Sequence, residues 1–383
     1  MHHIGCRQEK CVGARWQPIE CCAICVVPGG WSAAWHEIQI VICAQEWYVT
    51  TRTILSIDGG GVRGLLSAGV LAHIEQLLRS RNSLAEGGIA HNFDLIVGTS
   101  SGALIGLGLA VGNSAQAMVG VYQRHAKSIF SASWLGKWIN PLVGNNGATY
   151  KPDGLERVLR DILADYTLGH LGSTAIESQR PDRNAPLLMC TAYDTQQATP
   201  RFFKSWKPAH QNLPAWQVAR ASSAAPTYFP PMTMTINTDD PSDPSPPATL
   251  IDGGLFANNP AMSAWAEAKK LWPEDDILIL SIGSGERQEK YSANDKQFCN
   301  MFNLIKPTFN AMFDGQSDAV EYQLGKLYAD SGNYLRLQTE LAQASDSLDN
   351  VEAGNLRALE AEAMRLVASQ TGAIDAFIQG AWR

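Results

Sequence analysis

The 383-residue sequence predicts an α/β protein with a mostly parallel sheet and helices on the faces of that sheet. Short apolar segments of strand length alternate with segments of helical length, an order typical of parallel sheets. Two glycine-rich turns, at residues 58–64 and 98–102, each follow one of the strand-like segments. The fold prediction depends on this alternation and on the position of the two turns within it.

The first predicted elements follow in the order strand, helix, strand, helix. The helix after the first glycine turn is amphipathic, because its apolar residues recur at intervals of three and four. The second helix is apolar throughout and is expected to be buried. These four elements cover residues 53–57, 65–78, 93–97 and 101–111.

The remaining predicted elements continue this alternation. Asn259 and Pro260 suit the cap and the first position of a helix that runs to about residue 271. The tail from residue 324 onward is expected to be mostly helical. Further strands are predicted at 186–192, 201–205, 248–251 and 276–282, a further helix at 155–163, and a surface loop rich in proline and aspartate at 239–247.

Residues 1–48 differ in composition from the rest of the chain. They hold six of the eight cysteines and four of the eleven tryptophans, without a helical or strand period. We expect a disordered extension or the product of an upstream start site. Cys22 and Cys25 have the spacing of a metal knuckle, but no second pair follows, so a zinc site is not favoured. The functional domain is expected at 53–383, with a motif core at 53–270 and a helical part at 315–383.

Charge and composition narrow the class of protein. The net charge of −7 disfavours a general nucleic-acid binder, because such proteins usually carry a basic face. No run reaches the roughly 18 apolar residues of a membrane-spanning helix. The two cysteines beyond residue 44 do not make a disulfide framework, which is typical of a reducing compartment. We therefore expect a cytoplasmic protein.

Ser100 is the candidate nucleophile. It lies in the segment Gly98-Thr-Ser-Ser-Gly102, between a predicted strand and a predicted helix. This Gly-x-Ser-x-Gly arrangement is typical of a nucleophile elbow, in which the glycines leave room for a strained turn that exposes the serine Oγ. The N-terminal dipole of the following helix also favours negative charge there. A glycine-rich turn with an incidental serine is the alternative, and the strand and helix context disfavours it.

The glycine loop of residues 58–64, Asp-Gly-Gly-Gly-Val-Arg-Gly, is the candidate oxyanion hole. Three successive glycines allow the backbone N–H groups to approach a reacting carbonyl closely. We expect Gly60 and Gly61 to be the donors. Arg63 would add positive charge or fix the loop.

The same loop also fits the fingerprint of a dinucleotide-binding protein. Two details disfavour that alternative. Asp58 would lie beside a bound pyrophosphate and repel it. The acid that binds the ribose should end the second strand, whereas Asp94 lies near the start of that strand.

The serine needs a base, and the sequence offers an aspartate for this role. A hydrolase with the order serine, acid, histidine needs a late histidine, but none follows residue 210. Asp252 closes a predicted strand and precedes Gly253 and Gly254, which leaves one side of its carboxylate open. We therefore favour a Ser100–Asp252 dyad, in which Asp252 accepts the serine proton directly. The alternative is a turn aspartate, the commoner reason for Asp before glycine.

Together these motifs resemble the three signature motifs of the patatin-like phospholipase family. The motifs are the segments 58–64, 98–102 and 252–254, in the family's order, and segments 219–229 and 333–336 are similar as well. The resemblance covers about residues 53–370. It implies a three-layer α/β/α fold, lipid acyl hydrolase activity and no metal or other cofactor. Carried over residue by residue, it makes Ser100 the nucleophile, Asp252 the base and Gly59, Gly60 and Gly61 the oxyanion loop, with motif support from Asp58, Gly64, Gly98, Gly102, Gly253 and Gly254.

The expected function is the hydrolysis of fatty acyl esters in phospholipids or related lipids through an acyl-enzyme. Two alternatives stay open. One is a general carboxylesterase whose triad includes a histidine, for which the chain offers His91, His125, His170 and His210. The other is a non-catalytic lipid-binding or regulatory protein on the same fold. Neither the oligomeric state nor a partner other than the lipid is predicted.

Transient contact with a membrane surface is a further expectation. Residues 129–143 combine tryptophans and aliphatic residues with Lys137, a composition common in interfacial segments. The simpler interpretation is that these side chains belong to the core, and it is the favoured one.

Overall fold

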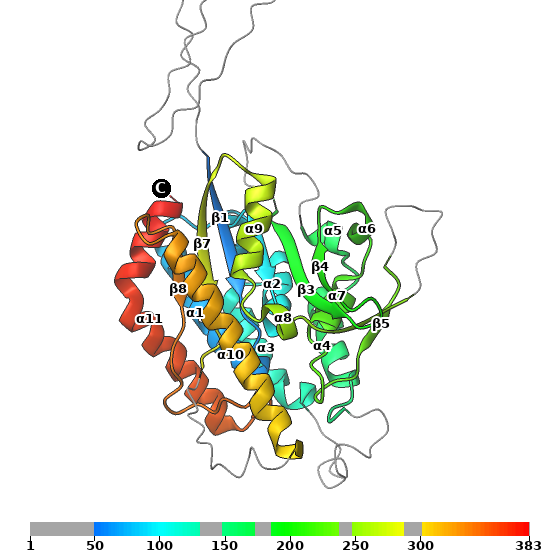
Figure 1. Cartoon of the computed structure of the whole chain (residues 1–383). Helices are drawn as coiled ribbons and strands as arrows, with labels where there is room; N and C mark the ends of the chain where they lie inside the picture. Colours follow the sequence, from blue (N-terminus) through cyan, green and yellow to red (C-terminus); the bar gives the residue numbers. More distant parts are fainter. Residues whose placement is uncertain (1–49, 131–147, 173–184, 237–246, 287–300, 383) are drawn as a thin grey trace, which may run out of the picture. The chain divides into compact units, whose positions relative to one another are not determined.

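Eight strands within the described residues form one mixed sheet (Figure 1). The computed structural model describes residues 50–130, 148–172, 185–236, 247–286 and 301–382. The strands are β1 (Thr51–Ile57), β2 (Leu95–Gly98), β3 (Leu187–Asp194), β4 (Thr199–Lys204), β5 (Met232–Met234), β6 (Ala248–Asp252), β7 (Asp276–Ile282) and β8 (Tyr334–Leu337). Their order across the sheet is β5-β6-β3-β2-β1-β7-β8, and β4 pairs with β3.

The centre of the sheet is parallel. Strands β1, β2, β3, β7 and β8 pair in parallel, whereas β4 and β6 run antiparallel to β3, and β5 runs antiparallel to β6. At the carboxyl end of β1, Ile57 pairs with Gly98 of β2 and with Ile282 of β7. The chain therefore leaves these three strands side by side, at the edge where open parallel sheets bind their ligands.

Helices cover both faces of this sheet. They are α1 (Gly64–Ser80), α2 (Ser101–Ala110), α3 (Ala115–Ile129), α4 (Asp153–Leu163), α5 (Leu168–Leu171), α6 (Pro208–Gln211), α7 (Ala215–Ser222), α8 (Gly254–Ala257), α9 (Ala261–Leu271), α10 (Met301–Leu327) and α11 (Ala353–Ala381). Figure 1 shows α9 and α10 in front of the sheet and α1 and α2 behind it. Of the helices described, none is long and apolar enough to cross a bilayer.

The helices on both faces of the sheet explain why its central strands are apolar along their length. Successive side chains of a strand point to opposite faces, so a sheet covered on both faces needs apolar residues at every position. In β1, Ile54 packs with α9 and the end of α10, whereas Leu55 and Ile57 pack with the helices of the other face. The prediction of a three-layer α/β/α fold with a mostly parallel sheet is therefore confirmed.

Most predicted elements have a counterpart within a few residues, but α5, α6, α7, α8 and β5 were not predicted, and α10 begins before the predicted helical tail. Three further differences concern longer or better-defined elements. Helix α3 has no predicted counterpart. Strand β8 lies inside the tail that was expected to be mostly helical. It was not predicted, because four residues are too short to show a period and their partner β7 is distant in sequence. Helix α9 begins at Ala261, one residue later than predicted, and the Asn259 side chain accepts a hydrogen bond from the Ala261 N–H at 3.1 Å.

Several predictions fall outside the described residues. These are the extension at 1–48, nearly all of the surface loop at 239–247 and most of the segment at 129–143. Only Ile129, Phe130 and residue 247 of these segments are described. The expected roles of these segments stay predictions.

A buried ion pair joins the first strand to the last. Arg336 on β8 donates to both carboxylate oxygens of Asp58, with Nη1–Oδ1 and Nη2–Oδ2 distances of 3.0 and 2.6 Å, and Nη1 also donates to the Ser281 Oγ on β7 at 2.9 Å. Burial lowers the pKa of Arg336, but the charge and hydrogen bonds of Asp58 outweigh it, so this pKa lies above its ordinary value. The pair holds β8 and β7 to the start of the glycine loop.

We predict that Arg336→Met lowers the free energy of unfolding by about 3–5 kcal/mol, because the change leaves the Asp58 carboxylate buried without its partner. Urea denaturation followed by circular dichroism measures this loss. Arg79→Ala is the matched control, since it removes the exposed end of an i,i+4 pair with Glu75 and should cost no more than about 0.5 kcal/mol. Equal losses in the two variants would contradict the structural role of Arg336.

Candidate active site

The register of β3 brings the two parts of the predicted dyad together. Strand β4 occupies one edge of β3 from Met189 to Asp194, so β2 and β6 must share the other edge. Along that edge Gly98, at the end of β2, pairs with Cys190, and Asp252, at the end of β6, pairs with Ala192. Because β2 and β6 run toward each other, Ser100 and Asp252 meet where the two strands end.

Ser100 lies in a sharp turn between β2 and α2. Its backbone angles, φ 54° and ψ −120°, lie in a region that residues other than glycine rarely occupy, and such strain is concentrated at functional sites. The turn is fixed in part by the Ser100 N–H, which donates to the Ser222 Oγ at 2.9 Å. Helix α2 begins at the next residue and directs its N-terminal dipole at the serine.

The motif glycines allow this turn to pack against β1. A β-carbon added at Gly98 would lie 2.4 Å from the Gly102 carbonyl oxygen, and one added at Gly102 would lie 2.2 Å from the Ile57 carbonyl oxygen. Both contacts are with backbone atoms, which cannot move aside without shifting a strand or a helix. Glycine at both positions is therefore a packing requirement of the elbow.

Asp252 lies at the end of β6 with its side chain almost completely buried. Burial raises the pKa of Asp252 to about 7, and this rise is limited by a hydrogen bond from the Gly254 N–H, 2.7 Å from Oδ1, and by an interaction with the Ser100 hydroxyl. A β-carbon added at Gly253 would lie 2.1 Å from the Thr191 Oγ1, so this neighbour of Asp252 must be small. The result is a carboxyl group that titrates near neutral pH and faces the serine.

The glycine loop presents two free donors beside the serine. Gly60 and Gly61 both line the pocket, and within the described part of the chain neither N–H donates a hydrogen bond. Gly61 has a positive φ of 57°, and an added β-carbon would lie 2.3 Å from the Leu348 carbonyl oxygen. The conformation of the loop at position 61 therefore requires glycine.

Two other residues of the predicted oxyanion hole lie outside the pocket lining. The Gly59 N–H donates to the Asn258 carbonyl at 3.0 Å and is not available to a ligand. The Arg63 side chain is buried and donates through Nη1 to the Gly285 carbonyl at 3.0 Å. Its position suits the second expected role, that of fixing the loop.

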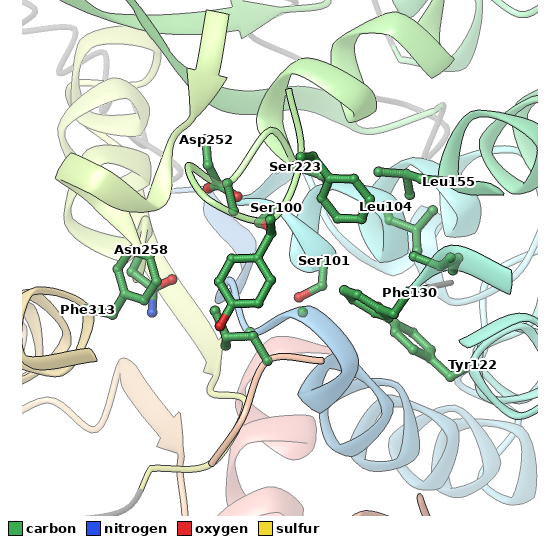
Figure 2. Close-up of a pocket in the computed structure, with 17 residues that line it drawn as sticks. Ser100, Ser101, Leu104, Tyr122, Phe130, Leu155, Ser223, Asp252, Asn258 and Phe313 are labelled. Atoms are coloured by element: carbon green, nitrogen blue, oxygen red, sulfur yellow. The ribbon is translucent and has the colours of Figure 1, made fainter. Parts of the chain in front are cut away.

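The pocket that contains these groups has mainly apolar walls. Figure 2 shows Ser100 near the centre, with Asp252 above it, Leu104, Leu155 and Phe130 to the right, and Asn258 and Phe313 to the left. Tyr122, Tyr228 and Phe229 complete the aromatic part of the lining. Such walls can hold a hydrocarbon chain against the serine.

A catalytic triad with a histidine and the binding of a dinucleotide both find less support in this geometry. None of the described histidines lines the pocket, and His210 accepts a hydrogen bond from the Lys204 N–H at its Nδ1. The backbone at Leu348 partly occupies the space over the glycine loop, since its carbonyl accepts a hydrogen bond from the Val62 N–H at 2.8 Å. A pyrophosphate bound as in dinucleotide sites would compete with that backbone.

Comparison with known proteins agrees with this geometry. The family model for patatin-like phospholipases matches residues 55–265, which is more than half of the chain and includes all three motifs. The chain belongs to the patatin-like phospholipase family. Patatin-like protein 2 of Oryza sativa is 29% identical over 79% of this chain and 80% of its own length.

One curated relative carries a name that describes it as inactive. A probable inactive patatin-like protein 9 of Arabidopsis thaliana is 27% identical over 74% of each chain. The crystal structure of VipD from Legionella pneumophila has a TM-score of 0.39 at 15% identity, covering 84% of this chain and 67% of VipD, a likeness too distant to carry an argument. Family membership by itself therefore does not establish activity.

Sequence analysis missed three residues that shape the site. Ser222 holds the Ser100 backbone, Arg336 holds Asp58, and Asn258 lines the pocket. Ser222 and Arg336 lie in the two segments noted for their family resemblance, which was the available signal for them. Asn258 lies shortly after the third motif, and its distance from that motif does not indicate a role.

We predict that kcat/KM for a short-chain ester rises with pH through an apparent pKa near 7, because only the ionised Asp252 carboxylate can accept a proton. Activity should therefore be lost as the pH falls below 7, whereas an unperturbed aspartate would sustain it to about pH 4. Steady-state kinetics between pH 5 and 9 measures this, with circular dichroism as the control for folding. A profile that stays flat down to pH 5 would contradict the assignment.

Proposed function

We propose that this protein is a serine acyl hydrolase that cleaves fatty acyl esters of phospholipids or related lipids with a Ser100–Asp252 dyad. The observation that carries the proposal is the meeting of three groups in one apolar pocket. A strained, half-buried serine faces a buried carboxylate, and two backbone donors without a partner among the described residues lie beside them. These are the nucleophile, the base and the oxyanion stabiliser that acyl transfer needs.

The first half of the reaction would form the acyl-enzyme. Asp252 accepts the hydroxyl proton as the Ser100 Oγ attacks the ester carbonyl carbon, and the Gly60 and Gly61 N–H groups stabilise the negative oxygen of the tetrahedral intermediate. The bond between this carbon and the alcohol oxygen then breaks. The proton on Asp252 passes to the departing alcohol, which leaves the acyl group on Ser100 and Asp252 ionised again.

The second half would release the fatty acid. Asp252 accepts a proton from water as the water oxygen attacks the acyl-enzyme carbonyl, and the same backbone donors stabilise the second tetrahedral intermediate. Collapse of this intermediate breaks the bond to Oγ, and the proton returns to Ser100. A pKa near 7 suits both directions of transfer, because a base works best when its pKa lies near the working pH.

The nature of the pocket supports a lipid substrate. Beside the serine the walls are aliphatic and aromatic side chains, which gain free energy when they cover a hydrocarbon chain. The family description, patatin-like phospholipase, supports the same substrate class. The general carboxylesterase and the binding-only protein are the competing functions, and the first of them lacks a described histidine in the pocket.

Ser100→Ala and Asp252→Asn should each lower kcat by at least about 10³-fold, and the double variant should be little worse than either, because members of one catalytic unit are not additive. Release of fatty acid from phosphatidylcholine vesicles and hydrolysis of a short-chain ester provide the two assays. Substitution of His91, His125, His170 and His210 by Gln is the control and should leave most of the activity.

Each competing function makes a different prediction in these assays. A protein that binds lipid without hydrolysis would show no activity that Ser100→Ala removes. A triad enzyme would lose its activity with one of the histidines. Losses that multiply in the double variant would contradict the direct dyad.

A further inference from the structure

The side chain of Asn258 is a polar group in the pocket that has no partner within the described residues. Asn258 is 7% exposed and follows helix α8, which begins two residues after Asp252. Its side chain lines the same pocket as Ser100, and its amide makes no hydrogen bond in the described part of the chain. An amide that lines the pocket and has no protein partner among the described residues is open to a ligand that enters the pocket.

The backbone around Asn258 is bonded to the glycine loop, to α10 and to the residue that precedes Ser100. The Asn258 carbonyl accepts the Gly59 N–H at 3.0 Å, and the Asn258 N–H donates to the Gln316 Oε1 of α10 at 3.3 Å. The preceding carbonyl, that of Ala257, accepts the Thr99 hydroxyl at 2.6 Å, next to the nucleophile. Such fixed placement is what a preorganised donor needs, because it then requires no rearrangement during the reaction.

The amide oxygen of Asn258 lies close to Gly59 of the glycine loop and to Gly254 beside the base. A β-carbon added at Gly59 would lie 2.5 Å from the Asn258 Oδ1 and 3.4 Å from the Ser100 Cβ. One added at Gly254 would lie 3.3 Å from the same amide oxygen and 3.1 Å from the Asp252 Oδ1. Figure 2 shows Asn258 to the left of Ser100 and below Asp252, beside Phe313.

We propose that the Asn258 side-chain amide is a third hydrogen-bond donor to the oxyanion, beside the Gly60 and Gly61 N–H groups. Half a turn of the carboxamide exchanges its oxygen and nitrogen, so the end that faces Gly59 can present an N–H to a negative oxygen. The amide is neutral, so it adds a donor beside Asp252 without adding a charge that would shift the pKa of this base. The inference rests on the proposed acyl transfer.

The test compares a mimic of the tetrahedral intermediate with a mimic of the substrate. A trifluoromethyl ketone with a fatty alkyl chain adds the Ser100 Oγ to its carbonyl carbon and carries the resulting oxyanion, whereas an alkyl-ether lipid binds without a carbonyl. Inhibition constants for both are measured in the full-length protein and in Asn258→Leu, which keeps the size of the side chain and removes the donor. Phe313→Leu is the matched control, because it alters the same wall of the pocket without removing a donor.

Asn258→Leu should lower kcat/KM by on the order of 10²-fold, as for the loss of other side-chain oxyanion donors. The ketone should bind more weakly by a similar factor, the ether lipid within about twofold of its original affinity, and the apparent pKa near 7 should not move. In Phe313→Leu both inhibitors should weaken together. Asn258→Ser, which fits the same space more easily, provides the comparison if Asn258→Leu does not fold, and the ketone should again weaken more than the ether.

Three results would overturn this inference alone. These are a kcat/KM within about threefold of the original, equal weakening of both inhibitors, or a shifted pH profile, which would make Asn258 an orienting residue for Asp252. The baseline is hydrolysis by the unaltered protein that Ser100→Ala abolishes. Absence of that baseline would instead overturn the proposed function, and this inference with it.

Discussion

The meeting of β2 and β6, end to end along one edge of β3, is the constraint on which the site depends. Ser100 follows β2, which runs parallel to β3, and Asp252 ends β6, which runs antiparallel to β3. Neither side chain therefore needs a long loop to reach the other. The glycine loop joins them because Ile57 at the end of β1 pairs with Gly98 at the end of β2. The hydrogen bonds of one sheet therefore place the proposed nucleophile, the proposed base and the start of the glycine loop side by side.

Two buried aspartates show how surroundings decide the role of a carboxylate. Asp58 has a bidentate arginine partner, and the pair ties β8 and β7 to the glycine loop. Burial raises the pKa of both aspartates, but Asp252 has no cationic side chain among the described groups that lower its pKa, which rises to about 7. The first carboxylate suits a structural ion pair, and the second suits proton transfer near neutral pH.

The sequence alone predicts much of the sheet and the main site residues, because these depend on local signals. Apolar runs and glycine turns at residues 53–57 and 58–64 are adjacent in the chain, and so is the elbow around Ser100. Contacts between distant segments carry no such signal. Strand β8 is a strand because β7 is beside it, Ser222 is placed by the approach of α7 to the elbow, and Asn258 depends on where Gly59 and Gln316 lie. A single sequence does not encode these pairings in a readable pattern.

Intact-mass and peptide mass spectrometry after rapid acid quench tests the central claim most directly. The full-length protein is mixed with a p-nitrophenyl fatty ester and quenched within the first turnovers. The account predicts a mass increase of one acyl group, carried by the peptide that contains Ser100 and absent from Ser100→Ala. An acyl group on any other residue, or hydrolysis without an adduct under conditions in which p-nitrophenol is released in a burst, would contradict it.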